Sequence, residues 1–237
     1  MKIKQFAFNP FGVNCFILSN KAGDAILIDP SASNPQEQGT LLQYIKSESL
    51  VVRRVLNTHL HLDHVLGNAF AEREFGIKAE AHEEDNFLLD LQEEQSMMFG
   101  LPCSDPAPAL GNFLAEGDIV EVPGIRLHVI HVAGHSPGGI AFYCENANDG
   151  ETSTAANGAA SENATDAIAA DRAKSVPVLF PGDILFAGSM GRADLFGGDE
   201  ESLILGIKHK LLTLPGETVV FPGHGPSTTI ENERRWF

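Results

Sequence analysis

Short runs that are rich in hydrophobic residues recur along the first sixty positions of the chain. They lie at residues 3–8, 14–18 and 25–29 and are separated by turn-forming residues, so they predict a meander of β-strands. A second group of strands is predicted further along, at residues 119–122, 125–132 and 139–144. The pattern therefore indicates two β-sheets.

Apolar residues at helical spacing alternate with further strand-like runs in the rest of the chain. Helices are predicted at residues 40–46, 67–76, 83–99, 200–212 and 228–236. Strands are predicted at residues 51–56, 79–82, 176–180 and 218–221. Residues 100–112 contain three prolines and are predicted to form a loop that could hang over a site. This mixture of elements is typical of an α/β protein.

Residues 145–175 interrupt the alternation of strands and helices. They are rich in Ala, Asn, Ser, Thr and Gly and contain almost no large apolar residue, a composition that cannot bury a core. The pattern of strands and helices resumes after them. We therefore expect one domain over residues 1–237, with a flexible surface insertion at residues 145–175.

The composition narrows the classes of function. The chain has 237 residues, 43% of them hydrophobic, and no run of 18 apolar residues that could span a bilayer as a helix. Its N-terminus lacks the apolar stretch of a signal peptide. The net charge of -16 disfavours a nucleic-acid partner. Three cysteines stand far apart without C-x-x-C spacing, which fits a reducing compartment. We expect a cytoplasmic protein without membrane or nucleic-acid partners.

Histidine is concentrated at one place in the sequence. Of the nine histidines, three lie in the segment T-H-L-H-L-D-H at residues 58–64. On an extended chain His59 and His61 point to the same side and can bind one metal ion together, and Asp63 shares that direction. His64 faces elsewhere unless the chain turns. This arrangement suits two neighbouring ions.

Three further residues of metal-binding type follow predicted strands. His135 lies in the loop G-H-S-P-G between two strands, Asp183 follows the strand at residues 176–180, and His224 follows the strand at residues 218–221. Loops at strand ends are where side chains for binding and catalysis are commonly placed, because the strands beneath hold them rigidly. We expect these side chains to reach a shared site.

Together these positions supply five histidines and two carboxylates: His59, His61, Asp63, His64, His135, Asp183 and His224. Imidazole and carboxylate ligands suit zinc, iron or manganese, and the set lacks the thiolates of a structural zinc site. Seven ligands for two ions leave positions open for water, which favours catalysis. A carboxylate can bridge two ions about 3.5–4 Å apart. Asp183 is the candidate bridge.

The motifs T-H-x-H-x-D-H, G-H-S-P-G, G-D and G-H, in this order, resemble the metallo-β-lactamase superfamily over nearly the whole chain. The resemblance implies an αββα sandwich of two mixed β-sheets flanked by helices. It further implies a first metal bound by His59, His61 and His135, a second bound by Asp63, His64 and His224, and Asp183 as the bridge.

Residues 182–195 and 222–230 are more similar to glyoxalase II-like (hydroxyacylglutathione hydrolase-like) enzymes. This resemblance implies hydrolysis of a small acyl thioester by a hydroxide that bridges two divalent ions, with Zn²⁺ first and Fe or Mn as alternatives. Asp63 would orient the water and accept its proton. The best-known β-lactamases carry cysteine in place of Asp183, which disfavours lactam hydrolysis. Glyoxalase II also has a C-terminal helical domain that helps hold glutathione and is not seen here, so recognition of glutathione stays open.

Other functions fit parts of the same pattern. A mononuclear iron persulfide dioxygenase, which the G-R-x-D segment at residues 191–194 also resembles, would bind iron through His59, His135 and Asp183. A metal-binding homologue without catalysis is a further alternative, against which the full ligand set argues. An RNA-processing nuclease of this superfamily is disfavoured by the acidic charge.

A few residues near the motifs have an open or structural interpretation. Arg192 and Asp194 suit either a substrate contact or a salt bridge that fixes the loop after Asp183. His128 and His131 precede His135 on a predicted strand, where we expect packing or surface roles. The sequence leaves the oligomeric state open.

Overall fold

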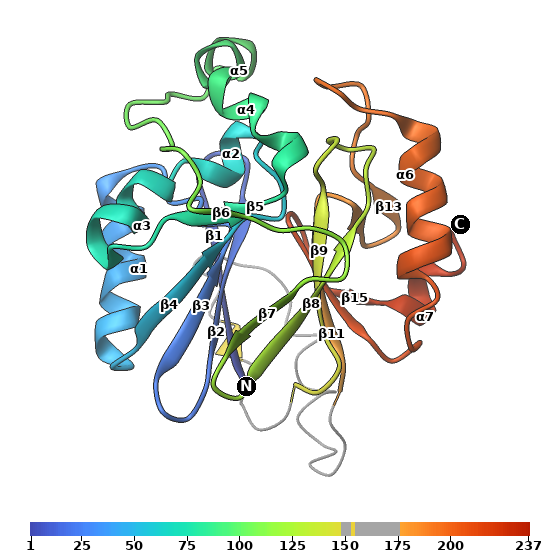
Figure 1. Cartoon of the computed structure of the whole chain (residues 1–237), viewed down its shortest axis with the longest axis horizontal. Helices are drawn as coiled ribbons and strands as arrows, with labels where there is room; N and C mark the ends of the chain where they lie inside the picture. Colours follow the sequence, from blue (N-terminus) through green and yellow to red (C-terminus); the bar gives the residue numbers. More distant parts are fainter. Residues whose placement is uncertain (148–152, 155–175) are drawn as a thin grey trace.

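Two β-sheets pack face to face, and helices cover their outer sides (Figure 1). The computed structural model describes residues 1–147, 153–154 and 176–237. Both sheets are mixed, with parallel and antiparallel strand pairs. The αββα sandwich expected from the sequence is therefore confirmed.

Within the described residues, the first sheet has seven strands in the order β10-β1-β2-β3-β4-β5-β6. Their bounds are β1 Lys2–Phe8, β2 Val13–Ser19, β3 Asp24–Ile28, β4 Val51–Leu56, β5 Ala79–Ala81, β6 Asn112–Phe113 and β10 Ser153–Thr154. The strands β1, β2 and β3 form the predicted antiparallel meander, whereas β3 to β6 pair in parallel. The parallel half places the carboxyl ends of β4 and β5 at one rim of the sheet.

The part of the chain that the structure describes gives the second sheet six strands, in the order β15-β14-β11-β9-β8-β7. Their bounds are β7 Ile119–Val122, β8 Ile125–His131, β9 Ile140–Cys144, β11 Val178–Gly182, β14 Val219–Pro222 and β15 Thr228–Thr229. A separate two-stranded ribbon joins β12 Leu185–Phe186 to β13 Ser189–Met190. The parallel pair β11 and β14 ends at the same rim that β4 reaches in the first sheet, because Gly182 at the end of β11 packs against the side chain of Thr58, two residues after β4.

The helices lie at the two outer faces and above the rim (Figure 1). Their bounds are α1 Pro35–Ser47, α2 Leu62–Val65, α3 Asn68–Phe75, η1 Glu83–Asp85, α4 Phe87–Asp90, α5 Gln92–Phe99, α6 Glu200–Gly206, η2 Ile207–Leu211 and α7 Ile230–Glu233. Helix α1 begins where the Asn34 side chain accepts hydrogen bonds from the amides of Gln36 and Glu37. No helix in the described ranges is long and apolar enough to cross a bilayer.

The inner faces of the two sheets form an apolar core. Phe16 of β2 meets Phe180 of β11 and Phe221 of β14, with ring centroids 5.1 and 5.9 Å apart. Each fully buried side chain of this size contributes about 1.5–3 kcal/mol to stability. Helix α1 buries Leu41 and Ile45 on the outside of the first sheet. The ligand candidates thus stand on loops held by a packed core.

The single helix predicted over residues 83–99 is wrong. The segment folds as three short helices, η1, α4 and α5, with breaks at Asn86 and Leu91. The physical reason is that buried polar side chains in this segment bind loop amides: Gln95 Oε1 accepts from the Leu62 amide at 2.9 Å, and Gln92 Oε1 from the Ala107 amide at 2.7 Å. These hydrogen bonds to distant loops form in place of a continuous helix.

Two smaller predictions also need correction. The helix expected at residues 228–236 is shorter, since residues 228–229 pair with β14 as β15 and only Ile230–Glu233 are helical. The insertion predicted at residues 145–175 lies largely outside the described residues. Its described part includes β10, which pairs in parallel with β1, so a piece of it extends the first sheet.

Candidate metal centre

The seven predicted ligand residues come together at the rim where strands of both sheets end. His59 and His61 follow β4, and Asp63 and His64 lie in the short helix α2. The other three stand in the loops after β8, β11 and β14. The turn into α2 directs His64 away from its extended neighbours. Four loops far apart in sequence therefore bring one ligand set together.

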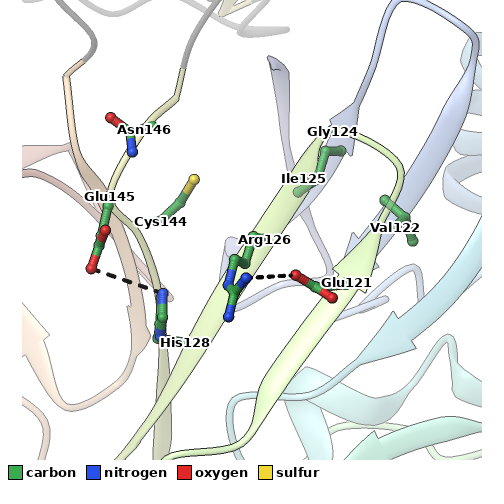
Figure 2. A pocket seen from close by; sticks show the side chains of 9 residues that line it. All are labelled: Glu121, Val122, Gly124, Ile125, Arg126, His128, Cys144, Glu145 and Asn146. Atoms are coloured by element: carbon green, nitrogen blue, oxygen red, sulfur yellow. Dashed lines mark ion pairs between the residues drawn. The ribbon is translucent and has the colours of Figure 1, made fainter.

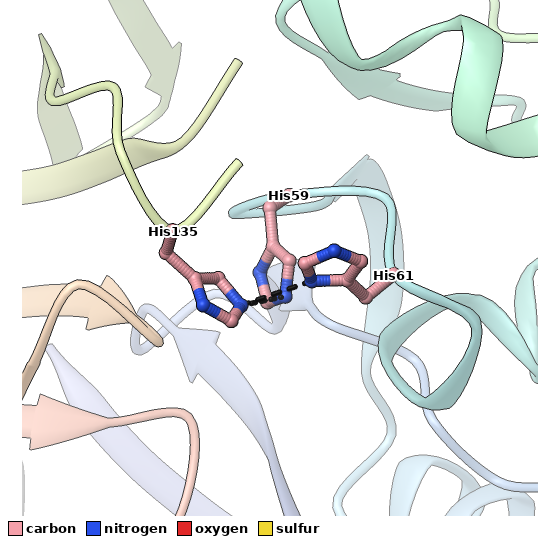
Figure 3. A group of neighbouring side chains, drawn as sticks. All are labelled: His59, His61 and His135. Atoms are coloured by element: carbon pink, nitrogen blue, oxygen red, sulfur yellow. Dashed lines mark hydrogen bonds between the residues drawn. The ribbon is translucent and has the colours of Figure 1, made fainter. Parts of the chain in front are cut away.

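Three buried imidazoles form the first group, shown in Figure 3. His61 Nδ1 lies 2.9 Å from His135 Nε2, and His135 Nε2 lies 3.2 Å from His59 Nε2. Each of the three residues is at most 4% exposed. Burial, joined by repulsion from the neighbouring imidazoles, lowers the pKa of His61 to about 3 and that of His59 well below its usual value. The rings of His59 and His61 are therefore neutral at pH 7, the form in which an imidazole can bind a metal ion.

Asp63, His64 and His224 form the second group. His64 Nε2 lies 3.4 Å from His224 Nε2, and His224 Nε2 lies 3.4 Å from Asp63 Oδ2. Asp183 stands between the groups: its Oδ2 is 3.3 Å from His224 Nε2 and 3.7 Å from His135 Nε2. One carboxylate oxygen is therefore near a member of each group.

In four of the imidazoles, the outer ring nitrogen, which points away from the centre, is fixed by a hydrogen bond. The inner ring nitrogen, which points into the centre, is thereby left as an acceptor. His59 Nδ1 is 3.1 Å from Thr58 Oγ1, and His64 Nδ1 is 3.1 Å from Asp29 Oδ2. His135 Nδ1 donates to the Arg192 carbonyl at 2.7 Å, and His224 Nδ1 to the Phe11 carbonyl at 3.1 Å. Inner nitrogens with lone pairs that face each other at 3.2–3.4 Å repel unless a cation or a proton lies between them. The donor set therefore fits bound cations.

The carboxylates Asp63 and Asp183 raise the pKa of both histidines in the second group. Burial lowers the pKa of His224, but hydrogen bonds to Asp183 and Asp63 outweigh it and raise the pKa to about 9. Burial also opposes protonation of His64, yet the charges of Asp183 and Asp63 raise its pKa well above the usual value. His224 is therefore protonated at pH 7 in the metal-free chain, and the pKa of His64 is shifted in the same direction.

Metal uptake should consequently release protons. An ion that binds Nε2 of His64 and His224 displaces the protons there, so we expect Zn²⁺ binding to the metal-free chain at pH 7 to release up to about two protons. The part due to His224 should disappear as the pH rises past about 9, because that ring is then already neutral. Calorimetry in two buffers of different ionisation enthalpy measures the release, and heats that do not depend on the buffer at pH 7 would contradict it.

Comparison with known proteins places this geometry in a family. The family model of the metallo-beta-lactamase superfamily matches residues 8–149, more than half of the chain. The chain belongs to the metallo-beta-lactamase superfamily. It is 32% identical to hydroxyacylglutathione hydrolase GloC of Haemophilus influenzae, over 99% of this chain and 96% of the relative. Members of this superfamily bind divalent metals, so a metal site at this rim agrees with the family.

Two solved structures share the superfamily fold over almost the full chain. The BLEG-1 B3 metallo-beta-lactamase superposes with a TM-score of 0.74 and 29% identity, over 98% of this chain and 96% of that one. TTHA1623 in a di-iron-bound form superposes with a TM-score of 0.73 and 30% identity, over the same shares. The resemblance inferred from the motifs is confirmed at the level of superfamily and fold.

Two carboxylates beside these seven candidate ligands were not singled out by the sequence. Asp29 follows β3 and accepts hydrogen bonds from the Thr58 amide and hydroxyl, both at 2.8 Å, as well as from His64. Asp85 ends η1 and accepts hydrogen bonds from the loops that carry His59, His61 and His135. Asp29 could have been found from the sequence, because it stands at the end of a predicted strand, much as Asp183 follows one. Asp85 could not, because it lies within an acid-rich segment.

The loop after Asp183 holds its charged residues in an ion pair. Arg192 and Asp194 form two hydrogen bonds of 2.6 and 2.8 Å and are mostly exposed. Of the two interpretations open from the sequence, the structure shows the salt bridge. The contact with the ligand set comes instead from the Arg192 carbonyl, which orients His135.

A second cluster of metal-binding residue types, His82, Glu84 and His131, lies outside the seven-residue set. The rings of His82 and His131 stack with centroids 4.1 Å apart. His131 Nε2 is 2.8 Å from the Pro137 carbonyl, and His82 Nδ1 accepts from the Glu84 amide at 3.2 Å. These hydrogen bonds occupy one nitrogen of each ring, and the stacked pair joins η1 to β8, a packing role like the one expected for His131.

A hollow of 330 Å³ surrounds the hairpin turn between β7 and β8 (Figure 2). Its wall includes the Glu121–Arg126 ion pair, His128 and the thiol of Cys144. None of the seven ligand candidates lines it. His128 is 3.9 Å from Glu145 and belongs to this hollow rather than to the metal centre.

Proposed function

We propose that this chain is a metal-dependent hydrolase of a small acyl thioester, of the hydroxyacylglutathione type. In this proposal His59, His61 and His135 hold one divalent ion, and Asp63, His64 and His224 hold the second. Asp183 is shared. The observation that carries the proposal is the position of Asp183 Oδ2, within 3.7 Å of His135 and 3.3 Å of His224.

The ligand set favours Zn²⁺, with Fe or Mn as alternatives, because five imidazoles and two carboxylates are hard to borderline donors. A related structure of 30% identity is described as di-iron-bound, which supports two ions. When bound, such ions lower the pKa of a water molecule and polarise a carbonyl group. The chain therefore needs no nucleophile of its own.

Asp63 has the properties of the group that orients the attacking water and accepts its proton. Burial raises its pKa, but the charge of His64 and the hydrogen bond from His224 outweigh this and keep the carboxylate ionised. Its Oδ2 stays close to His224 Nε2, so the carboxylate is held at the edge of the second group. A thioester expels a thiolate, which leaves without a strong acid, and the proposed site has no need of one.

The substrate class rests on family likeness and on the character of the leaving group. A relative of 32% identity that spans nearly the same length is named a hydroxyacylglutathione hydrolase. A small-molecule substrate follows from this proposal. We further propose that residues 1–237 form a single catalytic domain, supported by the shared core of the two sheets, and that the chain works in the cytoplasm, which its free cysteines Cys15, Cys103 and Cys144 support.

A substrate panel tests the proposal. The purified chain should hydrolyse hydroxyacylglutathione thioesters and release one thiol per substrate without consuming O₂. Acyl thioesters of other thiols should show whether glutathione is recognised, and a β-lactam serves as the comparison suggested by the 29% identical lactamase. Oxygen uptake with a glutathione persulfide, and no thiol release from any thioester, would replace the hydrolase with the dioxygenase alternative.

A further inference from the structure

Asp85 is a buried carboxylate that no step of the proposed reaction uses. It ends η1, directly after β5, and its side chain is fully buried. Its Oδ2 accepts hydrogen bonds from the Leu60 amide at 3.1 Å and the Ser136 hydroxyl at 2.8 Å, and its Oδ1 accepts from the Gly138 amide at 2.6 Å. All three donors are neutral, so hydrogen bonds rather than an ion pair compensate the buried charge.

The three donors stand beside the three histidines of the first group. Leu60 lies between His59 and His61 in the loop after β4, and Ser136 directly follows His135 in the loop after β8. These two loops belong to different sheets. Asp85 therefore ties together the two backbone segments whose relative position sets the spacing of the three imidazoles.

The backbone of the second loop packs directly against this carboxylate. A Cβ at Gly138 would lie 2.8 Å from Asp85 Cγ and 2.7 Å from its amide nitrogen, closer than real side chains approach. Position 138 therefore accepts only glycine while the carboxylate stays in place. The close approach also makes the 2.6 Å hydrogen bond of the Gly138 amide possible.

Asp29 interacts with the second group in a different way. It contacts a ligand ring directly, because its Oδ2 is 3.1 Å from His64 Nδ1. Asp85 touches no ligand ring among its hydrogen-bond partners and acts only through Leu60, Ser136 and Gly138. The two carboxylates thus support different groups of ligands.

We propose that Asp85 is the positioning residue of the first metal site, which sets the spacing of His59, His61 and His135 by joining their two loops. The inference rests on the metal centre proposed above. It assigns a role to the acid-rich segment after β5 that goes beyond packing.

Replacement by asparagine tests this proposal with little change of shape. The amide has one acceptor oxygen in place of two, and its NH₂ group would face either the Leu60 amide or the Gly138 amide, each of which can only donate. One N–H group then opposes another, and the two loops separate locally. Changes of this kind around metal ligands typically weaken metal binding 10–100-fold.

The experiment measures the affinity for each of two metal equivalents by chelator competition in Asp85→Asn, together with the urea midpoint. His61→Ala identifies the equivalent that belongs to the first group. Glu80→Gln is the matched control: Glu80 is a buried acid of β5 that accepts hydrogen bonds from Arg54 and Asn112 and serves no ligand loop. In Asp85→Asn we expect the first equivalent to bind about 10–100-fold more weakly and the second to keep its affinity, whereas Glu80→Gln keeps both.

Wild-type affinity for both equivalents in Asp85→Asn would overturn the positioning role. Equal weakening of both equivalents in Asp85→Asn and Glu80→Gln at similar loss of stability would overturn it as well, since that is the signature of general destabilisation. If Asp85→Asn does not fold, Ser136→Ala is the deciding variant, because it removes one hydrogen-bond donor to Asp85 and leaves two. Selective weakening of the first metal equivalent in Ser136→Ala would support the positioning role. Unchanged binding of that equivalent would refute it. A wild-type chain that binds fewer than two ions would instead defeat the proposed centre itself.

Discussion

Asp183→Ala is expected to lower bound metal below two equivalents per chain and to reduce thioester hydrolysis by at least about 10³-fold, while the fold remains. Asp183 is the only member of the set with an oxygen close to both groups. A bound metal contributes several kcal/mol to transition-state stabilisation, and each 1.36 kcal/mol corresponds to tenfold in rate. Elemental analysis, thiol-release kinetics and circular dichroism of the purified variant measure the three quantities.

Two variants serve as controls for Asp183→Ala. Asp194→Ala removes an exposed carboxylate from the same loop, and His128→Ala removes an imidazole of β8 that belongs to the hollow at the hairpin. Both should keep two equivalents and nearly full turnover. Retention of both metals and full turnover in Asp183→Ala would show that it is not a shared ligand, and loss of one equivalent in His128→Ala would bring that residue into the metal site.

Removal of metal by a chelator is expected to abolish turnover and to lower the melting temperature by roughly 8–16 °C. A ligand held at 1,000 times its Kd stabilises the folded state by about 4 kcal/mol, and for a chain of this size each kcal/mol corresponds to about 2–4 °C. Without ions Nε2 of His59 and Nε2 of His135 face each other at 3.2 Å, while the Nδ1 atoms of both rings are engaged in other hydrogen bonds. Thermal unfolding with and without chelator measures the difference.

Readdition of metal provides the control for the chelator experiment. Stoichiometric Zn²⁺ should restore both the melting temperature and turnover, whereas Mg²⁺ should not, because imidazole ligands do not suit it. If the melting temperature and the turnover are both the same before and after complete chelation, neither the stability nor the activity of the chain depends on metal bound by these seven residues.

The seven candidate ligands could be predicted from the sequence for two physical reasons. Three histidines and an aspartate within six positions cannot reach far from one another, so local chain geometry already confines them to one place. His135, Asp183 and His224 were accessible because each follows a strand, and the ends of β8, β11 and β14 meet at the rim that β4 also reaches. The structure brings all seven together, as the sequence predicts.

The residues that form hydrogen bonds to the loops of the candidate ligands could not be predicted in the same way. The roles of Asp85, Gln92 and Gln95 depend on which backbone amides lie opposite them, and those amides belong to loops distant in sequence. Hydrophobic periodicity reports only the apolar face of a segment, so it merged three short helices into one over residues 83–99. Tertiary hydrogen bonds decided the local structure there.

Most strands were predictable because both faces of each sheet are covered and the apolar pattern is strong. Residues 51–56 form β4 as predicted, and β14 is displaced by only one residue from the predicted strand. The strand β10 was not predictable, since Ser153 and Thr154 lie in a polar stretch whose pairing with β1 leaves no apolar trace in the sequence.

The number of metal ions per chain, measured by elemental analysis of protein purified without added metal, tests the central claim most directly. The arrangement of the seven residues predicts two divalent ions per chain, lost together with activity on chelation. One iron per chain, with oxygen uptake on a persulfide, would support a mononuclear site instead. A chain with no bound metal that takes up none at neutral pH would contradict the proposed centre.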